Sequence, residues 1–362
     1  MLVGIYNQLH RTGRELAVVK AYEKILEHNG ISYVKLDAEA PDFWEKVSQL
    51  DLFILRWGNY DSDRQRAYDL IPVIENNFDV KCYPDWNTCS TYDDKIKEYL
   101  LLKTRGFSFV DSNIFWDKNA ALKWAESAQW PKVFKLRGGA GSTNVLLVRT
   151  KKQAIRLIRK MFGSGVYAGK VFDAGQIRLT HFKPKQELRH IAANIYRWIT
   201  GQDVSPFWQV QKNYIMFQKF LPGNETDTRV TIIGDRAFAF RRKTRDGDFR
   251  ASGSGKIDYD TSGIDMRCIE IAFQISKEMK FQSMAYDFLF DQDGKPQFCE
   301  ISYTYVSSAI HRCTGYWDRD MNWREGHFWP ELLHLQDALN MTDLKAPDLD
   351  AVYDTAISGY AI

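Results

Sequence analysis

A glycine-rich segment between two apolar runs is the first feature of this sequence that could do chemistry. Residues 138–143 read Gly-Gly-Ala-Gly-Ser-Thr, and the runs 133–136 and 145–148 on either side are typical of β-strands. Glycines let backbone N–H groups approach an anion closely. No Gly-Lys-Ser/Thr follows and no helix begins there, so this is not a Walker A loop. A plain hairpin turn is the alternative.

Two lysines could supply positive charge to such a loop. Lys135 stands on the incoming strand, and Lys95 follows Asp94 at the start of a predicted helix over residues 93–103. A lysine ammonium is a compact charge that suits a phosphate oxygen. Either lysine alone is more simply explained as a solvated side chain. Together with the glycine loop they indicate a phosphate-binding site.

Two carboxylates lie in strands that are predicted to form a hairpin. Asp287 is within Ala-Tyr-Asp-Phe-Leu-Phe, Glu300 is within Gln-Phe-Cys-Glu-Ile-Ser, and Asp293-Gly294 forms the turn. An Asp and a Glu that face each other across a hairpin form a hard oxygen site, which Mg²⁺ prefers and shares with nucleotide phosphates. Charges near apolar strands are costly without a metal or a partner. A pair of rim carboxylates is the alternative.

Arginines recur on or near the same strands, at positions 229, 241, 242 and 250. The planar guanidinium fork suits phosphoryl oxygens. Arg250 belongs to Asp-Phe-Arg-Ala-Ser-Gly-Ser-Gly, a loop that joins an arginine to hydroxyls. A solvated basic face is the alternative.

Three units must position these residues. In the first, helices over 15–28 and 63–77 alternate with predicted strands at 2–6, 31–36, 52–55 and 80–83, which implies a parallel α/β layer. It lacks GxGxxG after its first strand, so we interpret it as scaffold or a substrate-side wall. The second unit holds the glycine loop and a basic amphipathic helix over 151–162.

The third unit holds a predicted helix over 269–279 and predicted strands at 215–220, 229–233, 236–242, 285–290 and 296–301. We therefore divide the chain into residues 1–92, 93–214 with an inserted segment 163–212, 215–340, and a tail of polar character over 341–362.

Composition narrows the class of protein. The 362 residues are 44% hydrophobic and 26% charged, as in soluble globular proteins, with a net charge of +3 that gives no argument for nucleic acid. No apolar run reaches the roughly 20 residues that span a bilayer. Five cysteines without a CxxC pair argue against a disulfide framework or a zinc ribbon. We expect a cytoplasmic protein without a membrane span.

The order of these motifs resembles the ATP-grasp superfamily of carboxylate–amine ligases, in particular the group of ribosomal-protein-modifying glutamate ligases and glutathione synthetase. The resemblance covers roughly residues 1–310 and is most specific from Asp94 to Ser302. It implies an α/β protein, α+β in its C-terminal half, with an ATP-grasp fold after an N-terminal pre-ATP-grasp α/β domain.

The resemblance also implies roles for single residues. Those that would bind ATP are Lys95, Lys135, Gly138, Gly139, Gly141, Ser142, Gln218, Lys219, Phe220, Leu221, Asp227 and Arg229. Those that would hold Mg²⁺ or Mn²⁺ are Asp287, Glu300 and Ser302. Arg242 and Arg250 would be catalytic and hold the substrate carboxylate and the acyl phosphate.

Three features depart from the family pattern. Ser302 stands where relatives have an asparagine metal ligand, and Lys219 stands where the hinge usually has a glutamate. Segment 163–212 is long, basic and aromatic where relatives have a short link. We interpret this segment as an acceptor- or partner-binding insertion, with surface packing as the alternative.

The implied function is an ATP-dependent ligase that joins a small-molecule carboxylate to an amine, with a sugar or peptide acceptor left open. Many relatives are dimers or tetramers, so we expect a homo-oligomer. An ATP-grasp kinase, a non-catalytic nucleotide-binding protein and a role in surface-polysaccharide modification are the alternatives. The Trp- and His-rich stretch 311–330 is interpreted as packing, with a glycan or nucleotide-sugar pocket as the alternative.

Overall fold

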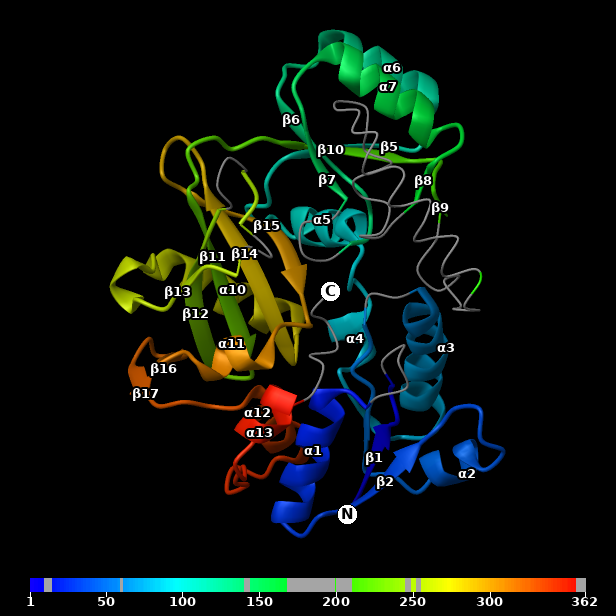
Figure 1. Ribbon diagram of the computed structural model, residues 1–362, viewed down its shortest axis with the longest axis vertical. Helices are drawn as coiled ribbons and strands as arrows, with labels where there is room; N and C mark the ends of the chain where they lie inside the picture. The colour runs from blue at the N-terminus through cyan, green and yellow to red at the C-terminus, as the bar shows by residue number, and fades with distance from the viewer. Residues whose placement is uncertain are drawn as a thin grey trace.

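The computed structural model describes residues 1–9, 15–58, 61–139, 144–167, 199, 210–244, 249–251 and 255–355. Its larger sheets form three bodies, shown in Figure 1 from the N-terminal body at the bottom to the glycine-loop body at the top. Within these ranges, every helix is too short or too polar to span a lipid bilayer.

The N-terminal body is a parallel sheet with helices around it. Its strands are β1 (Leu2–Tyr6), β2 (Ser32–Leu36), β3 (Leu52–Ile54) and β4 (Lys81–Tyr83), in the order β2-β1-β3-β4. Its helices are α1 (Ala17–His28), α2 (Phe43–Val47), α3 (Asp61–Asn77) and α4 (Trp86–Cys89). The predicted strand–helix alternation is confirmed, although α2 and α4 were not anticipated because they are only one turn long.

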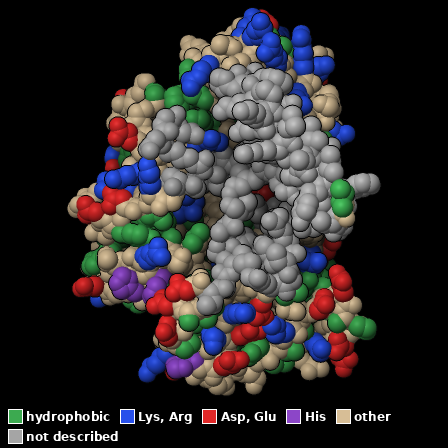
Figure 2. All heavy atoms as spheres, in the orientation of Figure 1, with side chains coloured by type: hydrophobic (Ala, Val, Ile, Leu, Met, Phe, Trp, Pro, Cys, Tyr) green, Lys and Arg blue, Asp and Glu red, His purple; other side chains and the backbone are tan. Residues whose placement is uncertain are grey.

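The central body is an antiparallel sheet in the order β5-β10-β6-β7. Its strands are β5 (Ser112–Phe115), β6 (Lys132–Lys135), β7 (Val145–Val148) and β10 (Ile215–Lys219), with a separate pair β8 (Val166–Tyr167) and β9 (Val210–Gln211). Helices α6 (Lys118–Ser127) and α7 (Lys151–Met161) pack together over it, and α5 (Lys95–Thr104) lies below it in Figure 1. Figure 2 shows Lys and Arg side chains gathered around α6 and α7, as the basic amphipathic pattern of α7 predicts.

The third body is a larger antiparallel sheet in the order β15-β14-β11-β12-β16-β17, with β13 paired to β12. Its strands are β11 (Thr226–Ile233), β12 (Arg236–Lys243), β13 (Ile257–Asp258), β14 (Ser283–Phe290), β15 (Pro296–Ser302), β16 (Gly315–Asp318) and β17 (Trp323–Glu325). A 3-10 turn (Thr261–Gly263) and α10 (Met266–Met279) follow β13, and α10 buries Ile269, Ala272 and Ile275 against the sheet.

The C-terminal segment returns to the N-terminal body. After α11 (Ser307–His311) come α12 (Pro330–Leu339) and α13 (Asp350–Thr355), and α1 packs against both. Leu344, Leu349 and Val352 are buried in the core around α1. Residues 341–355 are therefore not the polar appendage that their composition suggests, while the domain boundaries at 92, 214 and 340 stay predictions.

The aromatic stretch 311–330 is used for packing, as expected. The ring of His311 stacks on Trp329 with centroids 3.9 Å apart, and Trp329 stacks in turn on Tyr353 of α13. This column joins the C-terminal helices to the third body, because each of its rings comes from a different element.

A buried ion pair fastens the N-terminal body to α12, and its removal should be costly. Arg56, which follows β3, lies 3.4 Å from Glu331 of α12 and donates to the carbonyl oxygen of Tyr305 at 2.6 Å. We expect Arg56→Met to lower the free energy of unfolding by about 3–5 kcal/mol, because Glu331 is left buried without its counter-charge.

Thermal or urea unfolding of the full chain measures this loss. Lys46→Met is the matched control, because Lys46 pairs with Asp42 on the surface and the change should cost only about 0–1 kcal/mol. Equal losses of unfolding free energy in the two variants would show that the Arg56–Glu331 pair does not stabilise the contact with α12.

Candidate active site

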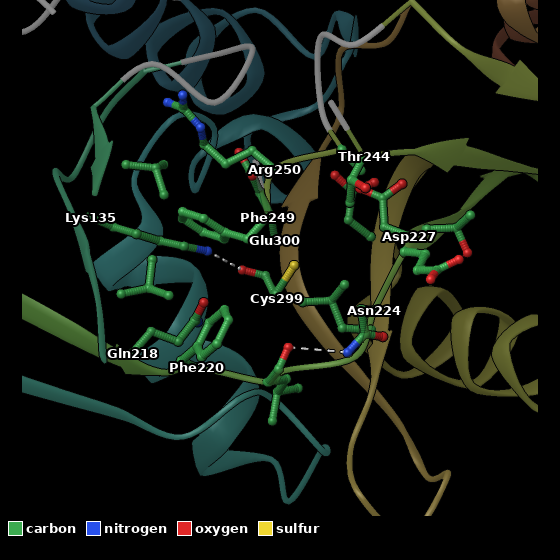
Figure 3. A pocket seen from close by; sticks show the side chains of 18 of the residues that line it. Lys135, Gln218, Phe220, Asn224, Asp227, Thr244, Phe249, Arg250, Cys299 and Glu300 are labelled. Carbon is green, nitrogen blue, oxygen red and sulfur yellow. Dashed lines mark hydrogen bonds between the residues drawn. The ribbon is translucent and has the colours of Figure 1, made fainter. Parts of the chain in front are cut away.

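A cavity of about 730 Å³ opens between the central and third bodies. Strands from both sheets and the start of α5 form its wall, as Figure 3 shows for Lys135, Gln218, Asp227 and Glu300. The sequence-predicted residues that line it are Lys95, Lys135, Gly139, Gln218, Lys219, Phe220, Leu221, Asp227, Arg250, Asp287 and Glu300. Side chains more than two hundred positions apart therefore meet at one cavity.

Other predicted residues lie beside or outside this wall. In the described chain Gly138, Arg229, Arg242 and Ser302 are not among the lining residues. Gly141 and Ser142 lie outside the described residues, as does most of segment 163–212, so their predicted roles stay predictions.

The first turn of α5 is fastened to the base of the glycine loop. The Asp94 carboxylate accepts from the backbone N–H of Lys97 at 3.0 Å, which caps the helix, and binds the Arg137 guanidinium at 2.7 Å. The backbone N–H of Lys95 donates to the carbonyl oxygen of Arg137 at 3.0 Å. These bonds fix the backbone position from which the Lys95 side chain extends.

The Lys95 ammonium is buried among oxygens. It donates to the carbonyl oxygen of Gly139 at 3.0 Å and lies 3.2 Å from Glu300 Oε1 and 3.9 Å from Asp93 Oδ1. Burial lowers the pKa of Lys95, but the neighbouring carboxylates, Glu300 first, outweigh burial and hold that pKa above its ordinary value. Lys95 is therefore charged at any physiological pH.

Asp93 also binds the backbone of the glycine loop. Its backbone is left-handed (φ 54°), and its Oδ1 accepts from the N–H of Gly139 at 2.6 Å. A Cβ at position 138 would lie 2.6 Å from Asp93 Oδ2, so this approach requires glycine. Burial raises the pKa of Asp93 to about 6, although Lys95 and the Gly139 N–H lower it.

Asp287 and Glu300 are cross-strand neighbours, as the hairpin predicts, with a register shift just after Asp287. They are not equivalent. Asp287 is 3% exposed and binds Arg229 through two bonds of 2.7 and 2.8 Å and Arg242 through one of 2.8 Å. Burial raises the pKa of Asp287, but these arginines outweigh it and hold the pKa below its ordinary range.

Arg242 is shared between two aspartates. Its guanidinium also binds Asp227 through bonds of 2.8 and 2.6 Å, and residues 227 and 242 are paired in the register of β11 and β12. Arg242 thus contacts Asp227 and Asp287 behind the cavity wall. Arg250 lines the cavity itself.

Part of the cavity wall is apolar, and a backbone turn adjoins it. Val133, Val145, Leu221 and Leu289 contribute from both bodies. The side chain of Asn224 fixes the turn, donating to the carbonyl oxygens of Leu221 and Phe290 and accepting from the N–H of Phe290 at 2.8 Å. A flat heteroaromatic ring fits between such walls, with backbone groups at its edge.

Charged side chains line the same cavity. Lys135 is 7% exposed and donates to the carbonyl oxygen of Cys299 at 3.3 Å. Lys243, Lys256 and Arg250 also line the wall, which suits an anionic ligand.

The carboxylates fit a hard cation that is shared with phosphates. No group of three His, Cys, Asp or Glu side chains in the described chain could hold a metal without other ligands. Mg²⁺ commonly takes one or two protein carboxylates and completes its shell with phosphate oxygens and water. Burial raises the pKa of the Cys299 thiol to about 12, so this thiol is protonated at neutral pH. The Ser302 hydroxyl is engaged with Thr304, to whose carbonyl oxygen it donates at 2.8 Å.

Three residues of the site were missed from sequence. Asp93 adjoins the Asp94-Lys95 motif, Asn224 lies in the Gly-Asn turn after the hinge strand, and Glu98 follows Lys95 by one helical turn. An acidic or amide side chain next to a motif is the signal that could have indicated Asp93 and Asn224. The role of Glu98 could be recognised only from its hydrogen bond to strand β15.

Comparison with known proteins agrees with this geometry. Residues 189–316 match the family model of the RimK-like ATP-grasp domain. The chain has an ATP-grasp fold. The resemblance to ATP-grasp ligases is therefore confirmed, and so are the α/β fold class and the ATP-grasp architecture.

Relatives by sequence are distant. The uncharacterized protein MG012 of Mycoplasma genitalium is 22% identical over 273 residues, which cover 70% of this chain and 81% of that protein. Its homolog in Mycoplasma pneumoniae is 23% identical over 221 residues, which cover 60% of this chain and 72% of that protein.

Solved ATP-grasp structures match nearly the whole chain. The biotin carboxylase domain of Hydrogenobacter thermophilus 2-oxoglutarate carboxylase, in complex with MgADP, has a TM-score of 0.55 at 11% identity, covering 96% of this chain and 71% of that one. N5-carboxyaminoimidazole synthetase from Staphylococcus aureus has a TM-score of 0.54 at 12% identity, covering 96% and 78%. D-cycloserine synthetase DcsG has a TM-score of 0.52 at 13% identity, covering 94% and 99%. At these identities the likeness shows the fold.

The raised pKa of Asp93 predicts a pH-dependent stability. A carboxyl whose pKa rises on folding from 3.8 to about 6 stabilises the fold fully below 3.8, and this contribution is lost as the pH rises through 6. The difference in Tm between wild type and Asp93→Asn should therefore fall by about 2–4 °C from about pH 5 to about pH 7.5.

Differential scanning calorimetry of both proteins across this range measures the difference. Asp260→Asn is the control, because hydrogen bonds from Ser262 lower the pKa of the exposed Asp260, so its carboxylate is ionised throughout this range and should give a flat difference. A flat difference for Asp93→Asn would show that Asp93 titrates normally in the folded protein.

Proposed function

We propose that the protein is an ATP-dependent ligase that activates a carboxylate as an acyl phosphate and joins it to an amine. The observation that carries this proposal is the convergence of Lys95, Lys135, Asp287 and Glu300 on one cavity between the central and third bodies. A cavity whose wall combines apolar side chains with cations and carboxylates matches a nucleoside triphosphate with its metal.

The nucleotide is expected to extend from strand β10 toward the two lysines. The base would lie beside Gln218, Lys219, Phe220 and Leu221, and Asp227 lies where the ribose would follow. Lys95 and Lys135 then face the phosphates. The Lys95 ammonium also donates to the carbonyl oxygen of Gly139. The same positive charge would therefore bind a phosphate and position the glycine loop.

Glu300 and Asp287 would hold Mg²⁺ or Mn²⁺ at the phosphate end, where such an ion offsets the negative charge that grows on phosphate oxygens during transfer. Ser302 is a weaker candidate for this role than the sequence suggests, because its hydroxyl already bonds to Thr304.

The reaction needs positioning more than a protein nucleophile. A carboxylate oxygen of the substrate attacks the γ-phosphorus, the bond to the bridging oxygen of ADP breaks, and an acyl phosphate forms. The amine nitrogen then attacks the acyl carbon, phosphate leaves, and the nitrogen loses a proton. Arg250 lines the cavity and is our candidate to bind the carboxylate and the acyl phosphate. Arg242 contributes to the same chemistry by orienting Asp287.

A substrate screen tests the function. Purified protein is incubated with ATP, Mg²⁺ and a library of carboxylates and amines, and released phosphate is followed. A ligase releases ADP and phosphate only when both substrates are present. A kinase consumes ATP with a hydroxyl acceptor and releases no phosphate, and a non-catalytic binding protein binds ATP without turnover.

Glu300→Gln tests the site. We expect ATP turnover to fall by about 100-fold or more, because the amide cannot supply the negative charge that a divalent cation needs. The melting temperature should fall, because Lys95 loses its nearest counter-charge, but the protein should stay folded, since Asp93 still lies 3.9 Å from Lys95.

Glu325→Gln is the matched control, because Glu325 is an exposed residue of β17 away from the cavity. Undiminished turnover in Glu300→Gln would refute the assignment of Glu300, whatever the substrate proves to be.

A further inference from the structure

Glu98 is a buried acid that no motif of the sequence explains. It lies on α5 one turn after Lys95, and 1% of its surface is exposed. A carboxyl group at such a position needs a hydrogen-bond partner, because burying it without one costs several kcal/mol. Its partner lies in the third body.

That partner is a backbone group of strand β15. Glu98 Oε2 accepts from the N–H of Ile301 at 3.1 Å, across 203 positions of sequence. β15 stands at the end of its sheet and pairs with β14 on one side only, so this N–H has no partner strand. Ile301 is 2% exposed, and its N–H would be buried and unsatisfied without Glu98.

The position of this bond connects it to the candidate metal site. The nitrogen of Ile301 and the carbonyl carbon of Glu300 belong to one planar peptide unit. A bond that fixes the Ile301 N–H therefore fixes the orientation of the peptide plane attached to the Cα of Glu300. Glu300 in turn places its Oε1 3.2 Å from Lys95, on the same helix as Glu98.

Main-chain contacts further along β15 do not replace this bond. The strand is also held by residues 108–110, through the Phe298 N–H to the Ser108 carbonyl and the Val110 N–H to the Phe298 carbonyl. Both lie on the other side of Glu300 from Ile301. The two groups of the peptide between Glu300 and Ile301 thus face opposite ways: its carbonyl faces β14, in the register that pairs Glu300 with Asp287, and its N–H is bound by Glu98.

We propose that Glu98 is a positioning residue that orients Glu300 toward the cavity by holding the peptide that follows it. This inference rests on the proposed function, since it assigns a role in the same site. Glu98 does not touch the cavity wall. It acts through Glu300 and needs an acceptor oxygen at the right distance rather than a negative charge.

Two substitutions distinguish the effect of side-chain length from the effect of the carboxyl group. Glu98→Gln keeps the side-chain length and a carbonyl acceptor but removes the ionisable carboxyl group. Glu98→Asp keeps a carboxyl group but is one methylene too short to reach Ile301. Glu278→Asp is the matched control on the exposed face of α10.

The readout is binding of ADP, by calorimetry, as a function of Mg²⁺ concentration, with Tm measured alongside. For Glu98→Asp we expect the half-saturating Mg²⁺ concentration to rise about tenfold, while ADP binding without Mg²⁺ stays within about twofold of wild type. Glu98→Gln should stay within about threefold of wild type in both measurements.

The opposite order, with Glu98→Asp near wild type and Glu98→Gln impaired, would overturn the proposal in favour of a charge role. Equal Mg²⁺ dependence in all four proteins would overturn it as well. If the wild type binds ADP with Mg²⁺ and turns over ATP, either of these two results refutes the positioning role of Glu98 and leaves the proposed function standing. A wild type that binds no nucleotide refutes the proposed function, and the role of Glu98 falls with it.

Discussion

Lys95 carries a buried positive charge whose ammonium lies 3.0 Å from the carbonyl oxygen of Gly139 and 3.2 Å from Glu300. These two contacts come from different bodies of the fold, so the charge joins the glycine loop to the third sheet. A buried ammonium is tolerated only where oxygens surround it. The carboxylates around Lys95 meet this requirement, and one of them, Glu300, also lines the cavity.

The helix that carries Lys95 explains why these groups meet. Its first turn is bound to the loop by Asp93 and Asp94, and its second turn is bound to strand β15 by Glu98. One rigid helix thus sets the distance between loop and strand. The central and third bodies are separate sheets, and this helix, bound to both, keeps their side chains in register.

Much of this arrangement could be predicted from sequence. The cross-strand pair of Asp287 and Glu300 followed from alternation along a hairpin, which is a local pattern. The strands that carry Lys135 and Gln218 were found for the same reason. The bond from Glu98 to Ile301 and the packing of Leu349 against α1 could not be found, because they join positions hundreds of residues apart and leave no periodic trace.

The arginines around Asp287 show how the sheet prepares the two carboxylates differently. Strand register pairs Arg229 with Asp287 and Asp227 with Arg242, so the charges of Asp287 are balanced inside the sheet. Replacing such a buried network by apolar residues is often neutral or stabilising, which makes stability a weak reason for its presence. Glu300 instead is partly exposed and faces Lys95 at the cavity. Under the proposed function, Asp287 would be held in place by arginines within the sheet, and Glu300 would meet the cation and its phosphates at the cavity.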